Sequence, residues 1–123
     1  MAKDLKRLAR ELREVESDVL SGDYRPLLPF LEYGYERIDE VRSSLLESGV
    51  SERLRAEFAE TAILGALRIG ESWYWTDFAL RWLEGGAPMT PRILTALEAA
   101  DVPRSEQRIR HRILGLRRQH AAT

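Results

Sequence analysis

The chain has 123 residues, enough for one domain with a modest core and too few for a second independent domain. Hydrophobic residues make up 44% of it and charged residues 32%, which excludes disordered, collagen-like and low-complexity proteins. The net charge of -1 argues against binding of nucleic acid or a membrane surface by the molecule as a whole. Leu and Ala far outnumber Ile and Val, a bias that favours helices. We therefore predict a single all-α domain over residues 1–123.

Several residue types and motifs are absent from the sequence, and their absence argues against further classes of function. The chain has no Cys, so it has no disulfide, no thiolate nucleophile and no Cys-ligated metal. The two histidines, His111 and His120, lie in a basic segment and form no Glu-x-x-His motif. No phosphate-binding glycine loop and no hydrolase elbow occurs. The start lacks a signal-peptide core, and the longest apolar run, residues 62–67, is too short to span a bilayer. We expect a cytoplasmic, non-catalytic protein without cofactor or metal and without membrane contact.

Apolar spacing and helix-ending residues predict six helices. In the first, about 3–21, apolar residues recur at alternate steps of three and four and form one stripe that ends at Gly22. A parallel homodimer through this stripe would bring like charges together, so we expect the stripe to pack within its own chain. A second helix is predicted over about 27–48, because Pro26 and Pro29 cost little at a helix entrance.

The later helices have clearer boundary signals. Ser51 is the expected N-cap of a third helix that ends before Gly70 and is apolar around most of its second half, so we place it at the centre of the fold. Thr90 followed by Pro91 is an N-cap and first-turn proline pair. The last three helices are predicted at about 72–84, from Pro91 to about 101, and from Ser105 onward.

Short connections between these helices predict three antiparallel hairpins, each formed by consecutive helices. The segment Ile-Leu-Gly-Ala-Leu at 63–67 returns thirty residues later as Ile-Leu-Thr-Ala-Leu at 93–97, each time in the first helix of a hairpin. Over residues 51–119 this spacing resembles that of HEAT and armadillo-like helical repeats. The resemblance implies a right-handed stack of hairpins, and an irregular helical bundle is the alternative.

Residues 73–82 hold all three Trp and five of the ten aromatic residues of the chain. At about 100° per residue, one face of the helix carries the residues that we interpret as core, namely Trp75, Phe78, Ala79 and Trp82. The opposite face carries Trp73, Leu80 and Arg81. Either a second layer of the domain covers that face, or it is exposed and binds a protein partner.

Charge is unevenly distributed along the chain. Residues 30–60 contain eight acidic side chains against four arginines, and the outward face of the second helix carries Glu32, Tyr33, Glu36 and Glu40. This face is either solvated or an acidic patch for a basic partner. The last twenty residues reverse the sign, with six arginines and one glutamate. They either favour the helix dipole and pair within the chain or contact nucleic acid, in which case the candidates are Arg104, Arg108, Arg110 and Arg112.

These features favour a protein-interaction module that binds and regulates one protein partner, as a bacterial immunity or inhibitor protein of this size does. Its predicted surface comprises Glu32, Tyr33, Glu36, Glu40, Trp73, Leu80 and Arg81. The alternatives are a nucleic-acid-associated protein that uses the Arg-rich end and a self-associating structural subunit.

Overall fold

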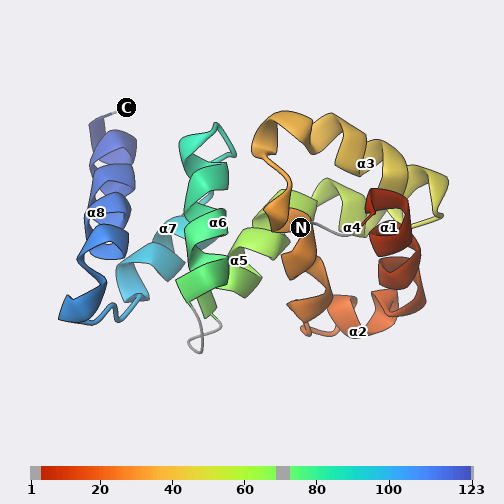
Figure 1. The fold of residues 1–123 in the computed structure, drawn as a ribbon, viewed down its shortest axis with the longest axis horizontal. Helices are drawn as coiled ribbons and strands as arrows, with labels where there is room; N and C mark the ends of the chain where they lie inside the picture. Colours follow the sequence, from red (N-terminus) through yellow and green to blue (C-terminus); the bar gives the residue numbers. More distant parts are fainter. Residues whose placement is uncertain (1–3, 69–72, 123) are drawn as a thin grey trace.

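The computed structural model describes residues 4–68 and 73–122, and every regular element in these ranges is a helix (Figure 1). The α-helices are α1 (Leu5–Glu14), α2 (Glu16–Leu20), α3 (Ile38–Glu47), α4 (Glu52–Ala56), α5 (Phe58–Arg68), α6 (Trp73–Glu84), α7 (Pro91–Ala99) and α8 (Gln107–Ala122). Three 3-10 helices accompany them: η1 (Arg25–Glu32), η2 (Tyr35–Arg37) and η3 (Arg104–Glu106). The predicted all-α class is confirmed, with more and shorter helices than the six expected.

The predicted first helix is broken near its middle. Asp4 caps α1, since its Oδ1 accepts the backbone N–H of Lys6 at 3.1 Å. At Val15 the backbone leaves the helical range, with φ -113° and ψ 16°, and α2 then runs to a turn at Gly22, whose φ of +117° suits glycine. Helix α1 packs against α3 and η1. The buried side chains of the apolar stripe are Leu8 and Leu12 in α1 and Val19 in α2. The expected packing of the stripe within its own chain is therefore confirmed.

The prediction of one helix over 27–48 is wrong. The chain forms η1, passes through a short extended stretch and then forms η2 and α3. Pro29 lies inside η1, where its missing N–H and its ring oppose a regular α-helix. In addition, the indole N–H of Trp82 donates to the carbonyl oxygens of Leu31 at 3.2 Å and of Tyr33 at 2.7 Å. The Trp82 indole, which comes from a distant part of the chain, therefore provides these two carbonyls with the hydrogen bond that a continuous helix would otherwise supply.

Helix α5 lies at the centre of the molecule, as predicted. The third predicted helix divides at Glu57 into α4, which Ser51 caps, and α5. Nearly every residue over 58–66 is buried, and α5 contacts η1, α6 and α7. Its approach to the start of η1 requires Gly65, because a Cβ at this position would lie 2.8 Å from the Cβ of Tyr24.

Two pairs of helices follow along the chain. Helix α5 packs against α6 and α7 against α8, while α5 also contacts α7 and α6 also contacts α8. Helices α6 and α8 run side by side in Figure 1, and η1 packs against α6 as well. Thr90 begins α7 as predicted, since its Oγ1 accepts the N–H of Ile93 at 3.3 Å. Consecutive helices therefore pack together as the sequence indicates, and α6 is covered from two directions.

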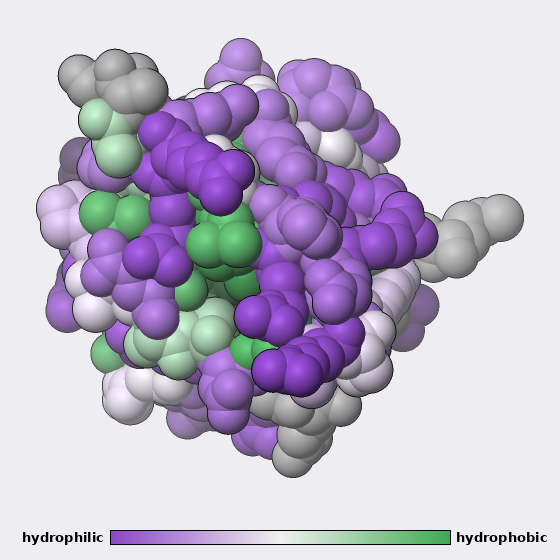
Figure 2. All heavy atoms as spheres, turned by 90° about the vertical axis from the view of Figure 1, so that its left-hand side faces the viewer, coloured by the Kyte–Doolittle hydropathy of each residue, from purple (hydrophilic) through white to green (hydrophobic). Residues whose placement is uncertain are grey.

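Aromatic rings from distant segments meet in the core. The rings of Phe30 and Phe58 pack edge to face at 5.1 Å between centroids, and Trp82 lies 6.5 Å from Phe58. Among the residues described, no buried side-chain nitrogen or oxygen lacks a hydrogen-bond partner. On the α8 side of the molecule, hydrophilic side chains surround a small apolar area (Figure 2). The fold therefore has one core and few apolar features on this face.

Candidate functional site

Helix α6 exposes a cluster of three aromatic rings. The ring centroids of Tyr74 and Trp75 are 4.8 Å apart, those of Tyr74 and Phe78 are 5.1 Å apart, and those of Trp75 and Phe78 are 6.4 Å apart. Tyr74 is 45% exposed, and the other two side chains are half-buried. Rings in mutual contact restrict one another, so the cluster has a defined shape with one side open to solvent.

Two charged side chains hold this cluster. The hydroxyl of Tyr74 donates to Oε2 of Glu32 at 2.6 Å and so joins the end of η1 to α6. This hydrogen bond raises the pKa of Tyr74 above its usual value, so the phenol remains a donor. The guanidinium of Arg81 lies 5.1 Å from the centre of the Phe78 ring and pairs with Asp77 at 2.9 Å. We call this site the α6 aromatic surface; its residues are Glu32, Tyr74, Trp75, Phe78 and Arg81.

The predicted division of α6 into a core face and an exposed face needs correction. Trp82 is buried as predicted, but Trp75 and Phe78, nearer the start of the helix, are only half-buried. Trp75 and Trp82 share a face about two turns apart, and the segment that accepts the Trp82 hydrogen bonds covers the later turn. Leu80 is fully buried because α8 packs against α6, so its assignment to a partner surface is wrong. Trp73 is half-buried.

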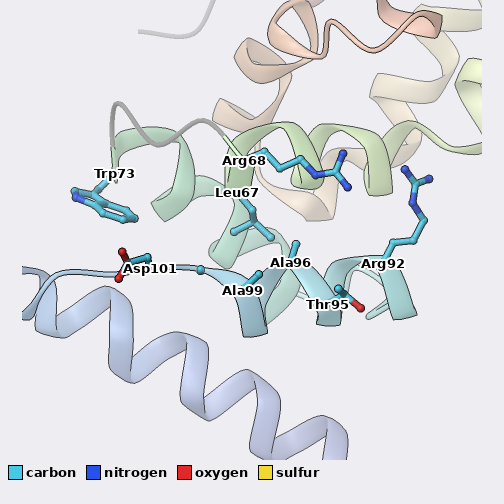
Figure 3. A pocket seen from close by; sticks show the side chains of 9 residues that line it. Leu67, Arg68, Trp73, Arg92, Thr95, Ala96, Ala99 and Asp101 are labelled. Carbon is cyan, nitrogen blue, oxygen red and sulfur yellow. The ribbon is translucent and has the colours of Figure 1, made fainter.

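Trp73 lines a hollow of about 440 Å³ between the ends of α5, α6 and α7. Figure 3 shows Trp73 and Asp101 at one end of this hollow and Arg68 and Arg92 at the other, with alanines of α7 between them. Arg92 forms an ion pair with Glu60 at 3.1 Å. Since Trp73 and Trp75 point to nearly opposite sides of the helix, the structure separates Trp73 from the α6 aromatic surface.

The predicted acidic patch is divided between two environments. Glu32 belongs to the α6 aromatic surface. Glu40 pairs with Arg37 at 2.6 Å, and this hydrogen bond lowers the pKa of Glu40. The same guanidinium lies 4.9 Å from the centre of the half-buried Tyr33 ring. Glu36 is exposed on η2. The structure therefore places Glu36 on η2 and Glu40 on α3, apart from the contacts that hold Glu32.

The arginines near the C-terminal end have different roles. Arg112 is 24% exposed and joins α8 to α6: it donates to the carboxylate of Glu84 at 2.7 and 3.1 Å, to the carboxylate of Asp77, and to the Asp77 carbonyl oxygen at 3.2 Å. The hydrogen bond with Glu84 raises the pKa of Arg112. Its guanidinium is therefore engaged within the chain, which makes Arg112 a weaker candidate for nucleic-acid contact than the sequence indicated. The other three candidates are exposed: Arg104, Arg108 and Arg110.

The sequence interpretation missed Tyr74 as a site residue. Its partner Glu32 lies on a different element, and no local pattern connects the two. One signal was available, because three consecutive aromatic residues occupy positions 73–75. Successive helical residues are rotated by about 100°, so these three side chains cannot all point into one core. At least one of them must be exposed or covered by another layer.

Neither a metal site or membrane-spanning helix among the residues described nor a similar known protein points to a function for this chain. Within residues 4–68 and 73–122, no group of three His, Asp or Glu side chains is placed to hold a metal ion. In the same part of the chain, no helix combines the length and apolar character needed to cross a membrane. Comparison with protein-family models, curated proteins and solved structures finds no match.

Proposed function

We propose that this chain is a non-catalytic protein-interaction module that binds and regulates one protein partner through the α6 aromatic surface. The observation that carries the proposal is the open aromatic cluster around Tyr74, held by Glu32 on one side and Arg81 on the other. Tyr, Trp and Arg are the residues most enriched where protein interfaces concentrate their binding energy. Because contacts within the chain already restrain these side chains, binding costs less conformational entropy.

The architecture supports the same proposal. We propose a HEAT-like stack of helical hairpins, on the basis that α5 contacts α7 while α6 contacts α8. Such stacks align successive helices into an extended surface that suits protein partners. A small inhibitor or immunity protein is the kind of regulator that this size and surface fit. The nucleic-acid alternative has less support, because Arg112 is engaged within the chain.

The test is copurification at natural expression level with the wild-type chain and with Tyr74→Ala. We expect one protein at near-equal stoichiometry with the wild type and at least about ten-fold less of it with the variant. Leu46→Ala is the matched control, since Leu46 is 58% exposed on α3, outside the α6 aromatic surface. Circular dichroism must first show that both variants fold. Copurified RNA or DNA, or equal recovery with Tyr74→Ala, would contradict the proposal.

A further inference from the structure

A second surface lies on the opposite side of α8 from the contacts with α6. A groove of about 250 Å³ runs between α7 and α8, with Ile113 at its base and Leu114 at its rim. Ile113 is only 5% exposed and Leu114 is 41% exposed, so Leu114 is the main apolar side chain that the groove offers to solvent.

The two walls of this α7–α8 groove carry opposite charges. Glu98 and Asp101 belong to the α7 wall and its continuation, while Arg110 and Arg117 belong to the α8 wall. In the ranges that the structure describes, no ion pair joins either acid to either arginine or to any other charged side chain. The groove therefore has two complementary sets of charges without ion pairs, on either side of the exposed Leu114.

We infer that this groove is the interface of a symmetric dimer, and that its occupant is a second copy of this chain. A twofold axis along the groove places the α7 wall of one copy over the α8 wall of the other. Glu98 and Asp101 of each copy then face Arg110 and Arg117 of the other, and the two exposed Leu114 side chains meet between them. Any other twofold axis in the plane of the groove brings like charges closer together, so the charge pattern selects this arrangement.

A second copy fits this pattern better than an unrelated helix. An isologous interface must be complementary to itself, and a groove with one acidic and one basic wall meets that condition. A partner helix of another protein requires no such balance of charge within the groove. The inference is independent of the α6 aromatic surface, because that surface lies on other elements.

The area of the face that contains the groove indicates how tightly the two copies should associate. Helix α8 has 16 residues and is about 24 Å long, and a face two helices wide measures about 20 Å across. Such a face offers about 500 Å² per copy, which is near the lower limit for specific interfaces and typical of transient ones. We therefore expect a dissociation constant in the micromolar range and an association that weakens with salt.

Sedimentation equilibrium from about 5 to 500 μM spans this range. The apparent mass of the wild type is expected to rise from 14.2 kDa towards twice that value. Glu98→Lys and Arg117→Glu should each raise the dissociation constant at least about ten-fold, because each brings like charges together twice. An equimolar mixture of the two variants should recover the wild-type affinity, since the reversed charges are complementary between them.

Controls separate this geometry from a general charge effect. Arg108→Glu makes the same change on α8 at an exposed position that does not line the groove, so it should leave the dissociation constant within about two-fold of wild type. Should a variant fail to fold, Asp101→Lys and Arg110→Glu form a second pair on the same walls. A wild type that remains at 14.2 kDa overturns the inference and leaves the groove to a different protein. A dimer that the variants leave unchanged, or a mixture that does not recover, overturns it equally.

Discussion

Trp82 is the side chain that most directly joins distant parts of the chain. It is 1% exposed and packs against Phe58 and Tyr35, and its indole N–H is shared between the carbonyls of Leu31 and Tyr33. These carbonyls belong to the stretch where the expected second helix is interrupted. The same side chain therefore fills the core and fixes the irregular backbone.

Two substitutions separate these roles of Trp82. Trp82→Ala should lower the free energy of unfolding by about 3–5 kcal/mol, because it removes the largest buried ring. Trp82→Phe retains an aromatic ring but leaves the two carbonyls without their donor, so we expect a loss of about 1–3 kcal/mol. Urea unfolding followed by circular dichroism measures both. A Trp82→Phe midpoint equal to wild type would show that the hydrogen bonds contribute no net stability.

Glu16 makes stability depend on pH. Its Oε1 accepts the N–H of Ser51 at 2.5 Å, and this hydrogen bond lowers the pKa of Glu16 below its usual value of 4.5. A carboxylate with a lowered pKa stabilises the fold above its unfolded pKa, and this contribution is lost as pH falls through the folded pKa. Because the side chain is partly exposed, the contribution is at most about 1 kcal/mol.

The comparison with Glu16→Gln tests this pH dependence. Between pH 7 and pH 3, about the range over which carboxylates protonate, the wild type should lose more unfolding free energy than the variant. Asp23 and Glu40 also have lowered pKa values, but they titrate in both proteins, so the difference isolates Glu16. Chemical unfolding at the two pH values measures it. Equal losses in the two proteins would show that the hydrogen bond from Ser51 does not favour the ionised form.

At the scale of elements, the sequence predicted helix ends that depend on adjacent residues. Thr90 with Pro91 begins α7, Ser51 caps α4, and the turn at Gly22 follows α2, each as expected. The interruption after η1 depends on Trp82, which comes from another element, so periodicity alone could not show it. The sequence pattern of α6 also left open whether the face with Trp73 and Leu80 is covered by a second layer or exposed. A helix covered from two directions has no single core face, and the buried Leu80 is the consequence.

The contact between α6 and α8 depends on Arg112. Its guanidinium reaches both Asp77 and Glu84, and 24% of the side chain is exposed. Replacing it with Met keeps much of the volume but leaves two carboxylates without this donor, so we expect a loss of about 1–3 kcal/mol. Arg108→Met on the same helix is the control, since Arg108 is exposed and forms no ion pair among the residues described. It should change stability by less than about 0.5 kcal/mol.

Hydrogen exchange shows where the effect of Arg112→Met falls. Loss of the connection to α6 should accelerate amide exchange in α8 more than in α1 or α3, which pack elsewhere. Uniform acceleration through the whole chain would contradict a local role for Arg112 and would indicate that α8 unfolds only with the rest of the domain.

At the scale of the whole molecule, the distribution of charge favours a protein partner over nucleic acid. The net charge is -1, and the arginine closest to the centre of the basic segment, Arg112, is engaged with α6. We therefore expect no appreciable binding of RNA or DNA at physiological salt, measured by fluorescence titration with labelled oligonucleotides. Each phosphate contact releases counterions, so tight binding that falls steeply with added salt would favour the nucleic-acid alternative.

Binding of the proposed protein partner should change in different ways when a charge is reversed and when an aromatic contact is removed. Glu36 is exposed on η2, and Glu36→Lys changes the long-range field without removing a contact of the aromatic cluster. It should slow association several-fold and change its salt dependence. Tyr74→Ala removes an aromatic ring from the centre of the α6 aromatic surface and should raise the dissociation rate by about 10–30-fold, with little change in association.

Trp73→Ala is the matched control for this separation of rates. It truncates a neighbouring aromatic side chain of the same helix, but Trp73 lines the hollow beside α7 and not the α6 aromatic surface. If the variant folds, both rate constants should stay within about two-fold of wild type. Surface plasmon resonance with the purified partner measures the rates for all three variants. A dissociation rate raised by Trp73→Ala but not by Tyr74→Ala would place the partner on the α7 side of the molecule, because Trp73 lines the hollow beside α7 and Tyr74 belongs to the α6 aromatic surface.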